Sequence, residues 1–320
     1  MGSLAAAAIV WYAREIVYLL FAGILVAIFF RRTSAWISRK SGLNVRICLA
    51  VLVLALVGFI FSVIFFLGPN IANQLSKLIS SMPAAIKKVH EIIAHSPLGR
   101  TFSTEFAGAE KLGSSVSSIA GKAAGYLFTT LGATTSLFAI LVFGLYMAVE
   151  PDLYLRGILR LVARSNRQRA RKILYGIGDA LQWWLIGQTV DMVFVGVLVL
   201  IGLWLLNIPL AMTLGLLAGL LDFVPVVGAI ISAIPAILVA LTLSPSKALY
   251  VAILFFGVHL LDGYLLGPII QRRTVNLPPL VMLAAIVFMG FVSGFLGILL
   301  ATPLAVIVTE LVRTLTDDTE

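Results

Sequence analysis

The sequence predicts an all-α fold: a polytopic bundle of transmembrane helices with broken or re-entrant helices and an extracytoplasmic amphipathic helical arm. Of 320 residues, 61% are hydrophobic and only 12% are charged. A soluble domain of this size needs about a quarter of its residues charged to cover its surface. The apolar residues also form runs long enough to cross a bilayer, with basic residues clustered beside them. We therefore predict an integral membrane protein.

The first predicted part, residues 1–67, holds N-terminal membrane helices. Its apolar block Leu4 to Phe30 is interrupted by Arg14 and Glu15. Either the block is one helix that carries an adjacent ion pair, or it is a hairpin of two short helices with that pair at the tip. We favour the hairpin, because two ionised groups at mid-depth on one helix would cost several kcal/mol. A second span, Ile47 to Leu67, follows a purely basic loop that is therefore cytoplasmic.

Three further parts precede the C-terminal core. Residues 68–125 place apolar side chains at spacings of three and four, which predicts an extracytoplasmic amphipathic helical segment. Residues 126–149 form a membrane span. Residues 150–178 form a cytoplasmic basic amphipathic helix that lies on anionic lipid headgroups, or else a solvated cytoplasmic loop. The basic stripe of this part consists of Arg156, Arg160, Arg164, Arg167 and Arg171.

The last predicted part, residues 179–320, is the C-terminal membrane core. The block that ends this core is expected to turn back on itself between Gly290 and Gly297. Three glycine pairs are spaced by four residues, which lets helix backbones approach closely, although the spacing is also common by chance in glycine-rich spans. The pairs are Gly215 and Gly219, Gly263 and Gly267, and Gly290 and Gly294. Tryptophans of this core are expected to mark the headgroup belt. The predicted crossings are Ala180 to Leu206, Leu210 to Asp222, Val226 to Leu243, Lys247 to Ile270 and Leu280 to Val312, and the tryptophans are Trp183, Trp184 and Trp204.

Two interruptions of this core hold carboxylates. Residues 221–228 and 259–268 each place an aspartate, a proline and glycines between otherwise apolar stretches. Ionisable groups at membrane depth are costly and mark ion or substrate pathways, and transporters hold their cargo at broken helices. We therefore predict a transporter whose pathway runs between the two interruptions.

Asp222 and Asp262 are the predicted transport and ion-coupling residues, with structural hydrogen bonding between helices as the alternative. His259 lies three residues before Asp262, so the pair shares a helical face and could relay protons, or His259 could satisfy a neighbouring carbonyl. Asp191 and Gln188 share a face in the same way and are expected to assist. Helix breaks or hinges are predicted at Pro225, Gly228, Gly267, Pro268, Pro279 and Pro303.

The order and spacing of several motifs resemble the autoinducer-2 exporter family of bacterial membrane proteins. These motifs are Gly187-Gln188, Gly196 to Leu206, Gly215-Leu-Leu-Ala-Gly219, Phe223 to Gly228, Asp262 to Pro268, Leu277 to Leu280 and Gly294 to Pro303. The resemblance covers essentially the whole chain, and two departures are Arg272-Arg273 and Pro278. It implies a multi-pass protein of the bacterial inner membrane that assembles as a homo-oligomer and takes part in quorum sensing.

Three functions remain open at this point. The first is secondary export of a small polar solute, by resemblance a signalling molecule like autoinducer-2, coupled to protons or uncoupled. The second is antiport of sodium or lithium ions against protons, and the third is an uncoupled channel or membrane scaffold. No enzyme, cofactor, metal site or nucleic-acid partner is predicted, because the chain has no His-Glu-x-x-His, no Gly-x-Ser-x-Gly and no phosphate loop.

Overall fold

The computed structural model describes residues 2–58, 130–266 and 278–317, together with residues 61, 62, 65, 73, 76, 77 and 80. Every regular element in this part of the chain is a helix, which confirms the all-α prediction. Four of the described helices are long and apolar enough to cross a membrane, or five if one bent pair counts as a single span. The predicted extracytoplasmic segment 68–125 lies almost entirely outside the described residues, and so do Gly267 and Pro268.

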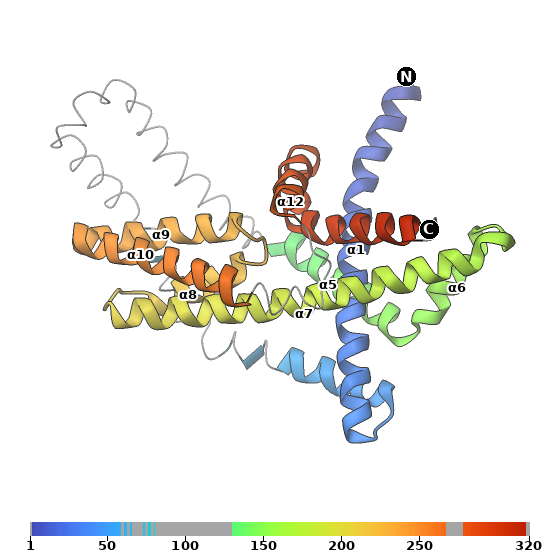
Figure 1. The fold of residues 1–320 in the computed structure, drawn as a ribbon, viewed down its shortest axis with the longest axis horizontal. Coiled ribbons are helices and arrows are strands. Elements are labelled where there is room, and N and C mark those ends of the chain that lie inside the picture. Colours follow the sequence, from blue (N-terminus) through green and yellow to red (C-terminus); the bar gives the residue numbers. More distant parts are fainter. Residues whose placement is uncertain are drawn as a thin grey trace. The chain divides into compact units, whose positions relative to one another are not determined.

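The described helices are shown in Figure 1. They form two compact units, which we call unit 1 (Met1–Ile60, Thr134–Gln188 and Ile270–Glu320) and unit 2 (Phe61–Ala133 and Thr189–Ile269). The helices are α1 (Gly2–Ser41), Val45–Gly58, α5 (Thr130–Val149), α6 (Pro151–Leu161), the 3-10 turn η2 (Arg164–Asn166), α7 (Arg167–Leu205), α8 (Ala211–Leu221), α9 (Val227–Leu243), α10 (Pro245–Leu261), the π-helical turn η3 (Asp262–Leu266) and α12 (Pro279–Asp317).

Helix α1 of unit 1 runs without a break through positions 14 and 15, so the predicted hairpin is wrong. The helix has 40 residues and is therefore about 60 Å long. The hydrocarbon core of a bilayer is only about 30 Å thick. A helix twice that length has room to place residues 14 and 15 away from mid-depth, which removes the cost that favoured a hairpin.

Helices α1 and α5 cross closely within unit 1. A Cβ atom added at Gly144 would lie 2.6 Å from Cγ1 of Val26, and one added at Gly23 would lie 3.0 Å from Cβ of Phe143. Around this crossing, Ala27, Phe30, Leu49 and Ala148 form a buried apolar cluster. Small residues thus permit close contact between two apolar helices, where dispersion rather than the hydrophobic effect stabilises the pair.

The chain bends by 87° between α5 and α6. Pro151 occupies the first turn of α6 and lacks the amide that would continue the hydrogen bonding of α5. No residue of α6 is buried, and its strong segregation of apolar and basic side chains fits a helix in the membrane interface. The basic stripe is not one helix, however: it divides between α6, η2 and the start of α7 because the chain is extended at Val162.

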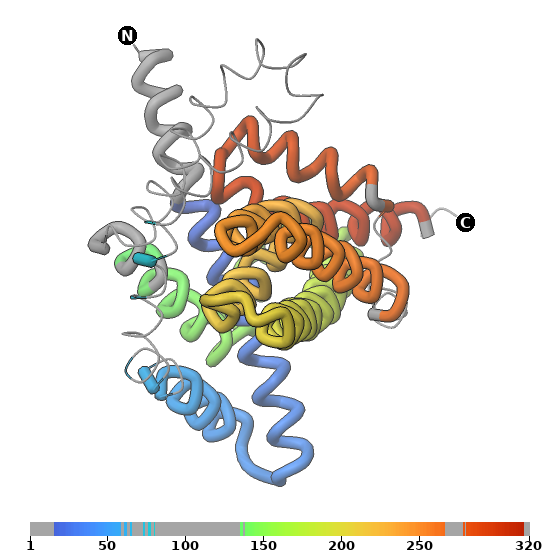
Figure 2. The backbone as a smooth tube through the Cα atoms, turned by 90° about the vertical axis from the view of Figure 1, so that its left-hand side faces the viewer, coloured from blue at the N-terminus to red at the C-terminus, as the bar shows by residue number. Residues whose placement is uncertain are grey.

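Helix α12 consists of two helices joined at Gly294, which confirms the turn predicted between Gly290 and Gly297. Gly294 has φ 61° and ψ −139°, a backbone conformation that only glycine adopts without strain. Figure 2 shows the two halves as separate runs of helix on either side of a sharp bend. The hydroxyl groups of Tyr18 and Ser293 form a hydrogen bond that connects α1 to this bend.

Unit 2 packs α8, α9 and α10 against the second half of α7 (Figure 1). Gly215 and Gly219 face α7 so closely that an added Cβ would lie 2.6 Å from Cβ of Leu200 and 2.6 Å from the carbonyl oxygen of Met192, respectively. This confirms the close approach predicted at Gly215 and Gly219, whereas nothing lies within 4 Å of a Cβ added at Gly263 or Gly294. The buried core of the unit draws on all four helices, with Val199, Ala218, Ala236 and Val251 among its members.

Helix α8 is too short for the crossing predicted from Leu210 to Asp222. It has 11 residues and is therefore about 16 Å long, roughly half of the hydrocarbon thickness. The apolar run in the sequence is longer because it includes residues in turns on both sides of the helix. Helix α8 thus ends at Leu221, with Asp222 as its C-cap, within an otherwise apolar stretch.

Substituting Gly294 by alanine tests the bend of α12. Nothing lies within 4 Å of a Cβ added there, so the cost is purely conformational, about 1–3 kcal/mol of unfolding free energy. Gly178, inside α7 of the same unit, also has open space and a helical backbone, so Gly178→Ala should leave stability unchanged or slightly raised. Thermal unfolding of both variants in the same detergent measures the difference, and equal midpoints would contradict the assignment.

Candidate functional site

The turn between α8 and α9 satisfies its own backbone. The amide of Asp222 donates to the carbonyl of Ala218, and that of Val224 donates to Leu221, at 3.0 and 3.1 Å. The amide of Gly228 donates to Val224 at 2.8 Å. Short turns of this kind allow a helix to end inside an apolar environment, where an unpaired backbone group would cost several kcal/mol. The break therefore places the Asp222 side chain at a helix end without exposing the backbone around it.

Val226 is held in a strained conformation at this turn. Its φ of 66° and ψ of −54° lie in the region that β-branched residues avoid. The amide of Val227 donates to the carbonyl of Pro225 at 2.7 Å, which closes a three-residue turn around Val226. Backbone strain of this kind costs about 1–3 kcal/mol and is concentrated at functional sites. No sequence pattern predicts this conformation, because valine is among the residues least expected to adopt a positive φ.

The second interruption begins where α10 changes to a π-helical turn. Helix α10 ends at Leu261, and Asp262 is the first residue of the turn. Single π-helical turns inside helices are frequent at functional sites. The ring of His259 lies one turn earlier, 6.5 Å from the ring of Phe255 between centroids. The structure thus confirms that Asp262 lies at an irregularity of the helix, while the rest of the predicted break is outside the described residues.

Four ionisable side chains of unit 2 gather from three helices, and we call them the carboxylate cluster: Asp191, Asp222, His259 and Asp262. The carboxyl groups of Asp191 and Asp262 lie within reach of each other. Asp262 also interacts electrostatically with Asp222 and His259, and Asp191 interacts with Asp222. The three aspartates, which are 31 to 71 positions apart in the sequence, therefore act on one another in the folded unit.

Asp222 is the buried member of the cluster, and Asp191, His259 and Asp262 are partly buried. Only 3% of Asp222 is exposed. Oδ1 of Asp191 and Nε2 of His259 are buried and have no hydrogen-bond partner among the described residues. Buried polar atoms in native proteins normally have a partner, in the protein, in water or in a ligand. These two atoms are therefore the points at which the cluster can bind a proton, a water molecule or a polar cargo.

The other predicted site residues are distributed as follows. Gln188 is buried on α7, and Pro225 lies in the turn between α8 and α9. Pro279 begins α12 and so marks a helix start, whereas Pro303 is a buried proline inside its second half. The basic-stripe arginines are exposed, apart from the partly buried Arg167. Pro235 inside α9 was not singled out from the sequence, although a proline in an apolar helix is itself a signal of a kink.

Comparison with known proteins places this arrangement in a family. Residues 3–317 match the sequence model of the AI-2E family transporters. The chain belongs to the AI-2E transporter family. This confirms the resemblance seen in the motifs and supports a role in membrane transport.

Individual relatives of the chain share about a quarter to a third of their residues with it over the matched regions. The chain is 31% identical over 158 residues to the putative transport protein YrrI of Bacillus subtilis, covering 49% of this chain and 45% of YrrI. It is 26% identical over 253 residues to the putative transport protein YueF of the same organism, covering 75% of this chain and 69% of YueF. It is 29% identical over 177 residues to the AI-2 transport protein TqsA of Escherichia coli, covering 55% and 51%. The matched regions of YrrI and TqsA thus span about half of those proteins.

Gly228 controls the shape of the turn that carries Asp222. A Cβ added there would lie 1.9 Å from the carbonyl oxygen of Leu221 and 2.8 Å from the amide of Asp222. Gly228→Ala should therefore force the turn apart at a cost of about 1–3 kcal/mol, so that backbone amides of residues 219–230 exchange hydrogen about tenfold faster or more. Gly257→Ala in α10 meets nothing within 4 Å and should leave exchange unchanged. Hydrogen exchange read by mass spectrometry compares the two, and the same rate in both would refute the constraint.

Proposed function

We propose that this AI-2E family member is a secondary transporter that exports a small polar solute, and that the carboxylate cluster couples this export to proton movement. The observation that carries the proposal is that Asp191, Asp222 and Asp262 lie near one another inside an apolar helical unit, with Asp222 buried. Ionisable residues in such units are rare and mark substrate pathways and proton relays. The cluster lies where two helices of unit 2 end or become irregular, as transporter binding sites do.

The chemistry of neighbouring carboxyl groups favours a proton as the coupled ion. An ionised carboxylate only accepts hydrogen bonds, so two carboxyl groups share one only when a proton lies on one of them. Asp222 and His259 interact with the same Asp262 carboxyl. A proton that leaves the Asp191–Asp262 pair would place like charges side by side, with Asp222 close to both. Binding and release of one proton thus change the charge that a polar solute meets.

The nature of the solute is supported by a relative rather than by the site. TqsA of Escherichia coli is named as an AI-2 transport protein, and this chain resembles about half of it. We extend that substrate class, a small polar signalling molecule, to this chain as part of the proposal. The polar atoms of Asp191 and His259 would supply hydrogen bonds to such a solute. Pro225 and Gly228, which shape the turn, would set the geometry of the pathway.

A second candidate is the exchange of sodium or lithium ions for protons. Its specific support is the buried Oδ1 of Asp191, an oxygen without a hydrogen-bond partner among the described residues, with two further carboxyl groups nearby. Carboxylate oxygens are good ligands for hard cations. This candidate uses the same cluster and differs only in what crosses the membrane.

Asparagine substitutions in the cluster test the proposal. In reconstituted liposomes, Asp262→Asn and Asp222→Asn should each lower proton-coupled solute flux about tenfold or more, because an amide cannot bind and release the proton. Asp152→Asn, in the exposed helix α6, removes the same charge outside the cluster and should leave flux unchanged. Flux and its dependence on an imposed pH gradient are measured together for each variant.

The result separates the candidate functions. Proton flux driven by a sodium or lithium gradient without added solute would select the antiporter. Conductance that ignores both gradients would select an uncoupled channel. If both asparagine variants keep wild-type flux and wild-type pH dependence, the cluster takes no part in transport and its role is purely structural.

A further inference from the structure

We propose that a cavity in unit 1, between α1 and α7, is a binding site for the headgroup of an anionic phospholipid. We call this cavity the interface pocket. It lies in a different unit from the carboxylate cluster, and nothing in the transport proposal uses its residues. The residues that line it come from α1 (Phe29, Arg32, Thr33, Ala35, Trp36 and Arg39) and from α7 (Gln182, Trp183 and Ile186).

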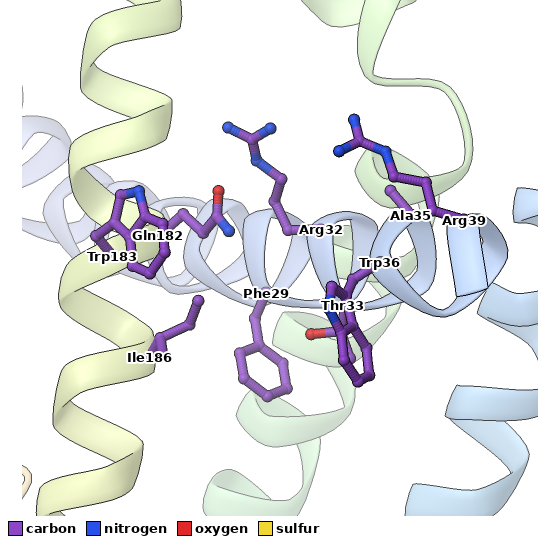
Figure 3. A pocket seen from close by; sticks show the side chains of 9 residues that line it. All are labelled: Phe29, Arg32, Thr33, Ala35, Trp36, Arg39, Gln182, Trp183 and Ile186. Atoms are coloured by element: carbon purple, nitrogen blue, oxygen red, sulfur yellow. The ribbon is translucent and has the colours of Figure 1, made fainter. Parts of the chain in front are cut away.

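The pocket has the size and the composition of a ligand site. Its volume is about 530 Å³, within the range of about 300–1,000 Å³ that small-molecule sites occupy. In Figure 3 the guanidinium groups of Arg32 and Arg39 extend to one side of α1, and the rings of Phe29 and Trp36 extend to the other. All of these side chains line the same cavity, so one part of its wall is cationic and another part is apolar. An amphipathic anion requires both kinds of surface.

The positive charge of the pocket is only partly neutralised. Arg32 forms an ion pair with Asp179 of α7, and about half of each side chain stays exposed. Arg39 has no ion pair among the described residues. Arginine binds phosphate oxygens through two parallel donors, which suits a phosphodiester better than a simple point charge would. We infer that Arg39 is the main phosphate contact and that Arg32 offers its remaining donors.

A buried amide adds a second, neutral recognition element. Oε1 of Gln182 is buried and has no hydrogen-bond partner among the described residues. A buried acceptor of this kind needs a donor to offset its loss of hydration. A phosphate alone is a poor partner for it, because an ionised phosphate accepts hydrogen bonds. A headgroup that carries hydroxyl groups beside its phosphate, such as the glycerol of a phosphatidylglycerol, supplies the missing donor.

The level of the pocket along both helices indicates a lipid rather than a soluble phosphate. On α1 the apolar run ends at Phe30, and Arg31 and Arg32 follow at once. On α7 the charged stretch ends at Asp179, and the apolar span continues from there. Both helices thus change from charged to apolar where the cavity lies, and tryptophans at this level are typical of the headgroup region. The apolar side chains of the pocket would contact the first part of the lipid's acyl chains.

Lipid binding to the purified full-length chain tests the site. Native mass spectrometry with dioctanoyl phosphatidylglycerol should show one saturable site that binds it about tenfold or more tightly than dioctanoyl phosphatidylcholine of the same chain length. Inorganic phosphate and glycerol phosphate, added in excess, should not displace the lipid. Equal binding of the two lipids would overturn the proposal, and displacement by either soluble phosphate would assign the pocket to a soluble anion instead.

Variants assign the binding to this pocket. Arg39→Gln should weaken phosphatidylglycerol binding about tenfold, because it removes a charge-assisted contact. Ile186→Trp should abolish binding by filling the cavity while keeping every charge, and its partly exposed position tolerates the larger ring. Arg31→Gln removes the same charge one residue outside the pocket lining and should bind like the wild type. The same loss in Arg31→Gln as in Arg39→Gln, or unchanged binding in Ile186→Trp, would show that the lipid binds elsewhere.

Discussion

The need to pair backbone hydrogen-bonding groups determines where helices can end inside the apolar part of this fold. An amide or carbonyl that leaves a helix there must find another partner, since water is not at hand. The turn after α8 meets this condition with short local hydrogen bonds, and it places the Asp222 carboxyl at a helix end. This turn requires a positive φ at Val226, so forming it costs conformational strain at that residue. A polar site in an apolar unit thus depends on a helix that ends in a turn with backbone hydrogen bonds of its own.

The carboxylate cluster follows from the packing around that turn. Gly215 and Gly219 bring α8 against α7, and this contact sets the distance between Asp222 and Asp191. The end of α10 adds His259, and the π-helical turn η3 that follows it adds Asp262. Three acids in mutual electrostatic contact are stable only when protons or counter-charges are shared among them. Close helix packing and the proposed proton binding are therefore parts of one arrangement.

Polar residues of unit 1 lie at the ends of the apolar parts of its helices. Its helices α1 and α7 are longer than a bilayer is thick, so each carries charged residues beyond its apolar part. Where the charged and apolar parts meet, arginine, tryptophan and glutamine side chains surround a cavity. The bend of α12 at Gly294 and the Tyr18–Ser293 hydrogen bond belong to this unit as well. Interfacial residues, rather than buried acids, give unit 1 its polar chemistry.

The sequence by itself determined the fold class, the family, the turn of α12 and the close approach at Gly215 and Gly219. Each of these depends on composition, on a local motif or on residues close together in the chain. Tertiary structure decided that α1 is one helix of 40 residues, which is long enough to place Arg14 and Glu15 away from mid-depth. It also decided that α8 ends at Leu221, since an apolar turn and an apolar helix have the same composition. Finally, only the packing of α7, α8 and α10 brings Asp191 to Asp262, because no local pattern specifies a contact between residues 71 positions apart.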